Sequence, residues 1–144
     1  EDLVEIYEMR LLLETAAVER AAEHLDPKVL AELLRGAEQL LSDASESASW
    51  IRRTLDFDVD FHDALAAAGG NRRLREEIAK YRLLVRAFCR MTADAKTLLA
   101  ALKEHLAVLK ALQGRNPAIA CQAMARHIQN RLDAVLEKLY PEIL

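Results

Sequence analysis

The sequence contains few of the residues that interrupt helices or favour strands. Among its 144 residues there are four glycines and three prolines, and aromatic residues make up only 5%. Alanine and leucine, which are strong helix formers, dominate the chain instead. We therefore predict an all-α protein, and the length suits one domain with a sizeable core.

The chain also lacks an excess of basic residues over acidic ones, a set of cysteines and long apolar runs. The formal net charge is −3, whereas a segment that binds nucleic acid requires a concentrated basic surface. The two cysteines, Cys89 and Cys121, cannot form a disulfide framework and show no C-x-x-C spacing. No apolar stretch approaches the length of a membrane span, and the first residues lack the hydrophobic segment of a signal peptide. We expect a cytoplasmic protein with no membrane partner.

Breaks in the helical pattern divide the chain into about six helices. Asp26 can cap a helix that Pro27 begins, and Gly69-Gly70 is a typical C-terminal stop. Asn71 can cap the helix that follows this stop. Because the loops are short, successive helices should be antiparallel neighbours in an up-and-down bundle. The expected ranges are about 2–24, 27–44, 47–69, 71–91, 95–113 and 117–139.

Three histidines and one aspartate form a candidate metal site. His62, His105 and His127 lie on core-facing or rim-facing stripes of three different predicted helices. Asp58 precedes His62 by one helical turn, so both side chains project from one helix face, about 40° apart around the axis. Nitrogen and oxygen ligands without thiolate suit zinc, nickel, manganese or iron.

A simpler interpretation of the histidines stays open on the pattern alone. A histidine on an apolar stripe is more often a core or rim residue with one hydrogen bond than a metal ligand. Burying several imidazoles and a carboxylate nevertheless costs free energy, which a divalent cation offsets directly. The pattern therefore allows either a metal site or a set of hydrogen-bonded core histidines.

Three motifs, taken in their order and spacing, resemble one known family. They are YEMRLLLETAA at residues 7–17, DFDVDFHDALAAAGGNRRL at residues 56–74 and EHLAVLKAL at residues 104–112. Ala120, Met124 and His127 follow the third motif, and His127 lies 22 residues after His105. Together they resemble the effector-binding FCD domain of FadR-type GntR transcriptional regulators, and the resemblance covers essentially the whole chain.

The resemblance implies an antiparallel bundle of six to seven helices around a central cavity. In the metal-binding branch of the family, an aspartate and three histidines hold a divalent ion that helps to capture a small carboxylate effector. By position these ligands are Asp58, His62, His105 and His127, and the expected ion is zinc, nickel or manganese.

Three further residues are candidates for contact with the effector. Arg10 matches an arginine of the first helix that faces the effector carboxylate in some family members, a role that suits a planar, always-charged group. An ion pair with Glu14 on the helix surface is the alternative for Arg10. The resemblance also places Tyr81 and Arg86 at the same cavity, although Arg86 could equally be a solvated residue.

Family members carry an N-terminal winged helix-turn-helix domain, to which nothing in this sequence corresponds. We therefore expect residues 1–144 to be the effector-sensing domain of a homodimeric bacterial regulator that contacts DNA only through that other domain. The alternatives are a metal-dependent hydrolase and a metal-free helical dimerisation domain. No catalytic acid or base is expected outside the ligand set, because Glu104 and Lys103 should point away from the site. We accordingly expect no enzymatic activity.

Overall fold

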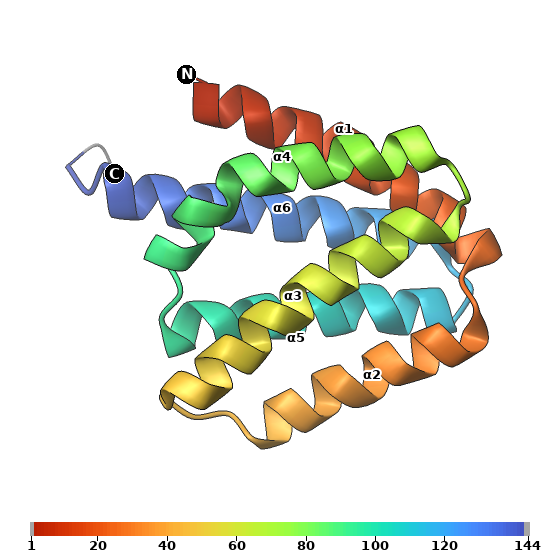
Figure 1. The fold of residues 1–144 in the computed structure, drawn as a ribbon, viewed down its shortest axis with the longest axis horizontal. Coiled ribbons are helices and arrows are strands. Elements are labelled where there is room, and N and C mark those ends of the chain that lie inside the picture. Colours follow the sequence, from red (N-terminus) through yellow and green to blue (C-terminus); the bar gives the residue numbers. More distant parts are fainter. Residues whose placement is uncertain (1, 143–144) are drawn as a thin grey trace.

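The computed structural model describes residues 2–142, and within that range it contains six α-helices and no strand. Successive helices run in opposite directions, and the two ends of the chain lie at the same end of the bundle (Figure 1). The predicted all-α, up-and-down architecture is confirmed. The helices are α1 (Asp2–His24), α2 (Pro27–Ser42), α3 (Ala48–Ala68), α4 (Arg72–Met91), α5 (Ala95–Gln113) and α6 (Pro117–Leu139).

Side-chain caps begin the helices where the sequence predicts breaks. The Asp26 carboxylate accepts a hydrogen bond from the Lys28 amide at 2.8 Å, and Pro27 occupies the first turn of α2. Asn71 Oδ1 likewise accepts from the Leu74 amide at 3.1 Å at the start of α4. These bonds satisfy amides that have no partner within the helix itself. Gly70, with φ of +68°, provides the left-handed turn between α3 and α4.

Helix α2 ends at Ser42, two residues earlier than the sequence predicted. Residues 42–47 are all exposed, so extending the helix through this polar segment would bury no apolar surface. Helix propensity alone does not stabilise the end of a helix, so α2 ends where its packing against the rest of the bundle ends.

Helix α6 packs between α1 and α5, and α3 crosses the bundle in contact with α1, α2, α4 and α5 (Figure 1). The α2–α3 contact is close, because a Cβ on Gly36 would lie 3.2 Å from the Phe57 ring. Trp50 is 1% exposed and donates its indole N–H to the Leu40 carbonyl at 2.8 Å. This packing brings α3, α5 and α6 together around the centre of the molecule.

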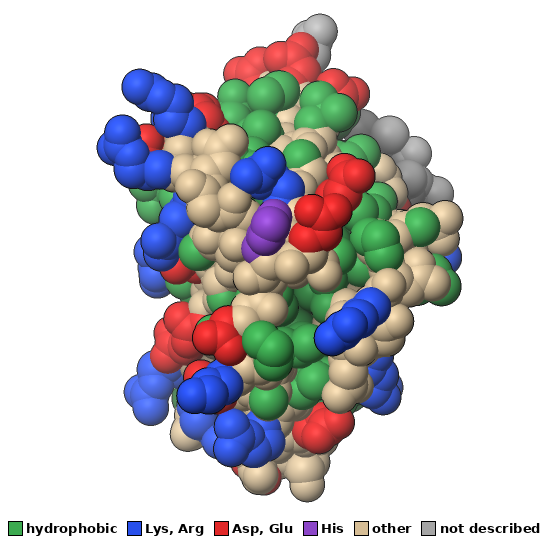
Figure 2. All heavy atoms as spheres, turned by 90° about the vertical axis from the view of Figure 1, so that its right-hand side faces the viewer, with side chains coloured by type: hydrophobic (Ala, Val, Ile, Leu, Met, Phe, Trp, Pro, Cys, Tyr) green, Lys and Arg blue, Asp and Glu red, His purple; other side chains and the backbone are tan. Residues whose placement is uncertain are grey.

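The surface is mixed in charge, in keeping with the small net charge. Acidic and basic side chains alternate across the end of the bundle drawn in Figure 2, and no broad basic area covers that face. Among residues 2–142, no helix is both long enough and apolar enough to cross a membrane.

Candidate metal centre

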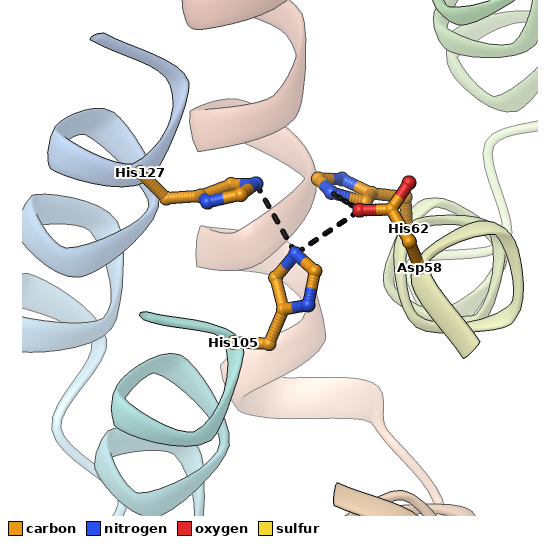
Figure 3. Close-up of side chains that lie close together, drawn as sticks. All are labelled: Asp58, His62, His105 and His127. Carbon is orange, nitrogen blue, oxygen red and sulfur yellow. Dashed lines mark hydrogen bonds and ion pairs between the residues drawn. The ribbon is translucent and has the colours of Figure 1, made fainter. Parts of the chain in front are cut away.

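Four side chains from three helices converge in the middle of the bundle. Helix α3 contributes Asp58 and His62, α5 contributes His105, and α6 contributes His127 (Figure 3). One potential ligand atom from each residue lies within 4.8 Å of all the others. The three histidines are 1–2% exposed, and the Asp58 side chain is 26% exposed. The structure thus brings together all four residues that the sequence singled out.

Local geometry explains why these residues meet. Asp58 and His62 are one helical turn apart and share the inner face of α3. Helices α5 and α6 form an antiparallel hairpin, and His105 and His127 stand at similar distances on either side of its turn. Side chains at such positions face each other across the hairpin, which places both rings against α3.

The separations within the cluster are close to those of neighbouring ligands around one ion. His105 Nε2 lies 3.2 Å from His127 Nε2 and 3.3 Å from Asp58 Oδ1. His62 Nε2 lies 3.6 Å from the same Asp58 oxygen. Ligands about 2.0–2.1 Å from a zinc-like ion stand about 3.0–3.4 Å apart, so only small movements would complete a coordination shell.

Two of the imidazoles are held from behind by carboxylates. His62 Nδ1 donates a hydrogen bond to Glu14, and His127 Nδ1 donates to Glu104 Oε2 at 2.6 Å. A ring that donates from Nδ1 presents the Nε2 lone pair on its other side, which is the tautomer that binds a metal. In both rings that lone pair is directed into the cluster.

The Nε2 atom of His62 provides a direct test of fit, because it is buried and has no hydrogen-bond partner among the described residues. His105 Nε2 faces two acceptors, Asp58 Oδ1 and His127 Nε2, which one proton on His105 can serve. A cation at the same place would replace that proton and would also satisfy His62 Nε2. The donor set therefore fits a divalent ion, although the sequence and geometry do not select among zinc, nickel and manganese.

Each carboxylate at the cluster is paired in turn with an arginine. Arg10 Nε lies 2.9 Å from Glu14 Oε1, and both side chains are nearly inaccessible to solvent. Arg82 Nη2 lies 2.6 Å from Asp58 Oδ2. Arg131 Nη2 lies 3.3 Å from Glu104 Oε1, which also accepts a bond from Asn130. The arginines thus pair with the candidate ligand Asp58 and with the two carboxylates that hold His62 and His127.

The charges of these groups suit metal binding. Burial lowers the pKa of His105 to about 4, against the opposing influence of Asp58, and burial also lowers the pKa of His127. Burial alone would raise the pKa of Asp58, but the Arg82 guanidinium and the nearby His105 and His62 rings hold it well below its usual range. At neutral pH, His105 and His127 are therefore neutral and Asp58 is ionised, as metal coordination requires.

A cavity of about 40 Å³ adjoins the cluster, and Arg10 lines it together with Asp58 and His127. A larger cavity of about 300 Å³ opens between α3 and α4 and shares Asp58 with the first. The predicted effector residue Arg86 is exposed and lines the larger cavity only, whereas Tyr81 is partly buried and lines neither cavity.

The prediction that Glu104 points elsewhere was wrong, because its carboxylate bonds the ring of His127. Glu14 does pair with Arg10, but the pair is buried beneath the site and not on the helix surface. Arg82 and Arg131 were missed entirely. The spacing of Arg10 and Glu14 was a usable signal, whereas Glu104 and His127 come from different helices and no local pattern links them.

Comparison with known proteins identifies the family and the fold. Residues 5–130 match the FCD domain family. The fold is similar to that of Escherichia coli (E. coli) McbR/YncC, with a TM-score of 0.81 and 21% identity over 95% of this chain. The match spans 65% of the McbR/YncC chain, so the present chain is the shorter of the two.

Two structures of the FCD domain of TM0439, a proposed transcriptional regulator, are also similar. The metal-free form gives a TM-score of 0.78 at 18% identity, and the Zn²⁺-bound form gives 0.71 at 20% identity. Each match covers 96% of this chain and 94% of the TM0439 chain. No curated protein matches the sequence. With most of its length matched by the family, the chain belongs to the FCD domain family.

Proposed function

We propose that this domain is the effector sensor of a bacterial transcriptional regulator of the GntR type. In this proposal Asp58, His62, His105 and His127 hold a divalent metal ion, and a small carboxylate metabolite binds beside it. DNA would be contacted by a separate domain outside residues 1–144, and two copies of the chain would form the homodimer.

One observation carries the proposal. The Nε2 atom of His62 is buried and has no hydrogen-bond partner within residues 2–142, while Glu14 holds the opposite nitrogen of the same ring. A histidine that serves only the core would use both ring nitrogens or leave one in water. The neighbouring Nε2 atoms of His105 and His127 complete a donor set that a cation would satisfy.

A bound divalent ion would supply open coordination positions for the effector carboxylate. Arg10 lines the adjoining cavity and carries a permanent positive charge, so it would attract the same anion. A ligand with different affinities for two arrangements of the helices would shift their populations and thereby control the attached DNA-binding domain.

The geometry favours this function over hydrolysis. Glu14 and Glu104 are the carboxylates nearest the cluster besides Asp58, and each already accepts a hydrogen bond from a histidine ring. A general base must be able to take a proton from water at the reacting centre, and neither carboxylate is placed on that side of its ring.

Elemental analysis of the purified protein tests the metal site. We expect about one divalent ion per chain in the parent and a loss of the ion in His62→Ala and His127→Ala. His24→Ala is the matched control, because the His24 side chain is 56% exposed and lies outside the cluster. A parent protein that takes up no zinc, nickel or manganese on soaking would overturn the metal site.

Calorimetric titration of the metal-loaded protein with small organic acids then tests the sensing function. We expect at least one short carboxylate to bind, and we expect that binding to weaken when the ion is removed by chelation. Metal uptake without binding of any acid in a broad panel would contradict the effector-sensing role and leave only the metal site.

A further inference from the structure

Three buried side-chain atoms lack a hydrogen-bond partner among residues 2–142, and they lie in one region. One is His62 Nε2 in the metal cluster, and the other two are Tyr7 Oη and Arg131 Nε. Tyr7 and Arg131 both line the cavity of about 40 Å³ that also reaches Asp58 and His127. Because buried polar atoms are nearly always satisfied, these atoms mark the place of a polar ligand.

The Tyr7 hydroxyl is a hydrogen-bond donor with nothing to donate to. The side chain is 2% exposed, and the neighbouring Cys89 thiol forms no hydrogen bond of normal geometry with it. Burial raises the pKa of Tyr7, with a further contribution from Cys89 and an opposing one from Arg10 and Arg131. The hydroxyl therefore keeps its proton at neutral pH and can donate it to an anion.

Arg131 also has an N–H donor without an acceptor among the described residues. Its Nη1 bonds the Thr97 carbonyl at 3.2 Å and its Nη2 bonds Glu104 at 3.3 Å, which leaves Nε unpaired. These two bonds hold the guanidinium in place. Arg131 and Tyr7 come from α6 and α1, which pack side by side, and both residues line one cavity.

The arginine and carboxylate charges around the cluster balance one another. The three arginine–carboxylate pairs contribute three positive and three negative charges. A divalent ion would therefore add two uncompensated positive charges to a largely buried site, which is costly unless anions accompany it. A singly charged acid would leave half of that charge uncompensated.

We propose that the cavity binds a short dicarboxylate, with one carboxylate at the metal cluster and the other on Tyr7 Oη and Arg131 Nε. This inference rests on the proposed function and names the class of effector and a second anchoring site for it. A dicarboxylate balances the charge of the ion and also satisfies both unpaired donors.

The size of the cavity restricts the length of the acid. A volume of about 40 Å³ holds the equivalent of roughly three water molecules, since one water needs about 10–15 Å³ on the same measure. A cavity of this size therefore favours the shortest dicarboxylates, such as oxalate and malonate. Longer dicarboxylates would require the helices to separate.

The test compares acids of equal length that differ by one carboxylate. Zinc-loaded protein is titrated calorimetrically with malonate against propionate and with succinate against butyrate, and its zinc content is measured afterwards. We expect at least one dicarboxylate to bind about tenfold or more tightly than its monocarboxylate partner, because the second carboxylate gains two donors.

Variants separate the proposed anchor from simple chelation of the ion by two carboxylates. Tyr7→Phe removes only the hydroxyl, and we expect it to weaken dicarboxylate binding about five- to tenfold while monocarboxylate binding changes less than twofold. Arg131→Lys should act in the same direction when compared at equal zinc content, because Arg131 also holds Glu104 behind His127. Tyr140→Phe is the matched control, because Tyr140 is 52% exposed and lines neither cavity.

The outcomes distinguish this inference from the proposed function. Equal binding of mono- and dicarboxylates would overturn the inference and leave the sensor function intact. A dicarboxylate preference that Tyr7→Phe and Arg131→Lys do not reduce would also overturn it, since both carboxylates would then lie on the ion. Failure of every acid to bind zinc-loaded protein would contradict both proposals.

Discussion

At the scale of single residues, the carboxylates behind the histidines matter as much as the ligands themselves. Glu104 orients His127 and is itself held by Arg131 and Asn130. Such a carboxylate fixes the tautomer of the ring and increases the basicity of the nitrogen that faces the ion. The affinity of the centre for metal therefore depends on residues that never touch it.

The first prediction concerns Glu104→Gln, which keeps the size of the side chain and removes its charge. We expect the affinity for zinc to fall about 10–100-fold, because the amide no longer fixes the His127 ring as a charged acceptor does. Competition with a chromogenic chelator measures the change. Glu137→Gln, at an exposed position on α6, is the control and should bind zinc like the parent. An unchanged affinity in Glu104→Gln would show that the His127–Glu104 bond does not support the site.

The arginines explain how the same centre can remain folded without metal. Arg82 neutralises Asp58, and Arg10 does the same for Glu14 beneath the cluster. Removing one member of a buried pair leaves an uncompensated charge, so these contacts are part of the core as well as of the site.

At the scale of helices, the caps determine where each segment begins and hence which residues face the centre. Helices α2 to α6 all begin with a side chain that accepts a bond from an amide of the first turn. For α4, that residue is Asn71, which directly follows the left-handed Gly70. The start of α4 is thus specified by two adjacent residues.

We predict that Asn71→Ala destabilises the domain by about 0.5–2 kcal/mol, because the Leu74 amide loses its acceptor. Chemical denaturation of the metal-free protein measures the free energy of unfolding. Asn71→Asp, which retains an acceptor oxygen, should stay close to the parent. Equal destabilisation by both substitutions would indicate that the amide nitrogen of Asn71 has a role that capping does not explain.

At the scale of the whole molecule, the buried histidines make stability depend on pH. The pKa of His105 is about 4 in the folded protein, below the ordinary value of 6.5 that applies when the chain is unfolded. Between these values the unfolded chain binds a proton that the folded chain does not, so stability falls as pH decreases. Asp58, with its lowered pKa, contributes further loss in more acidic solution.

We therefore predict that the melting temperature of the metal-free protein decreases as the pH is lowered from about 6.5 to 4 and changes little just above this range. Thermal unfolding followed by circular dichroism in a buffer series measures it. His105→Gln removes the titrating ring and should flatten the decrease. A melting temperature that rises over the same range would contradict the neutral, buried state of His105.

The helices were predictable from the sequence because their signals are local. Pro27, Asn71 and Pro117 mark boundaries through contacts within one turn of the chain, and the structure places α2, α4 and α6 to begin at or directly after them. The end of α2 was less predictable, because it depends on where the tertiary contacts of the helix end and no local sequence signal marks it. The ligand pair Asp58 and His62 could also be predicted from the sequence, since the two residues share a helix face.

Only the tertiary structure decided what surrounds those ligands. Glu14 meets His62 across 48 residues, and Arg82 meets Asp58 across 24 residues, so no spacing along the chain predicts either contact. Which carboxylate lies behind which ring depends on how the helices rotate and cross when their apolar faces pack. The sequence by itself determined the elements and the inward-facing histidines. Packing determined the paired charges and the cavity with its two unsatisfied donors.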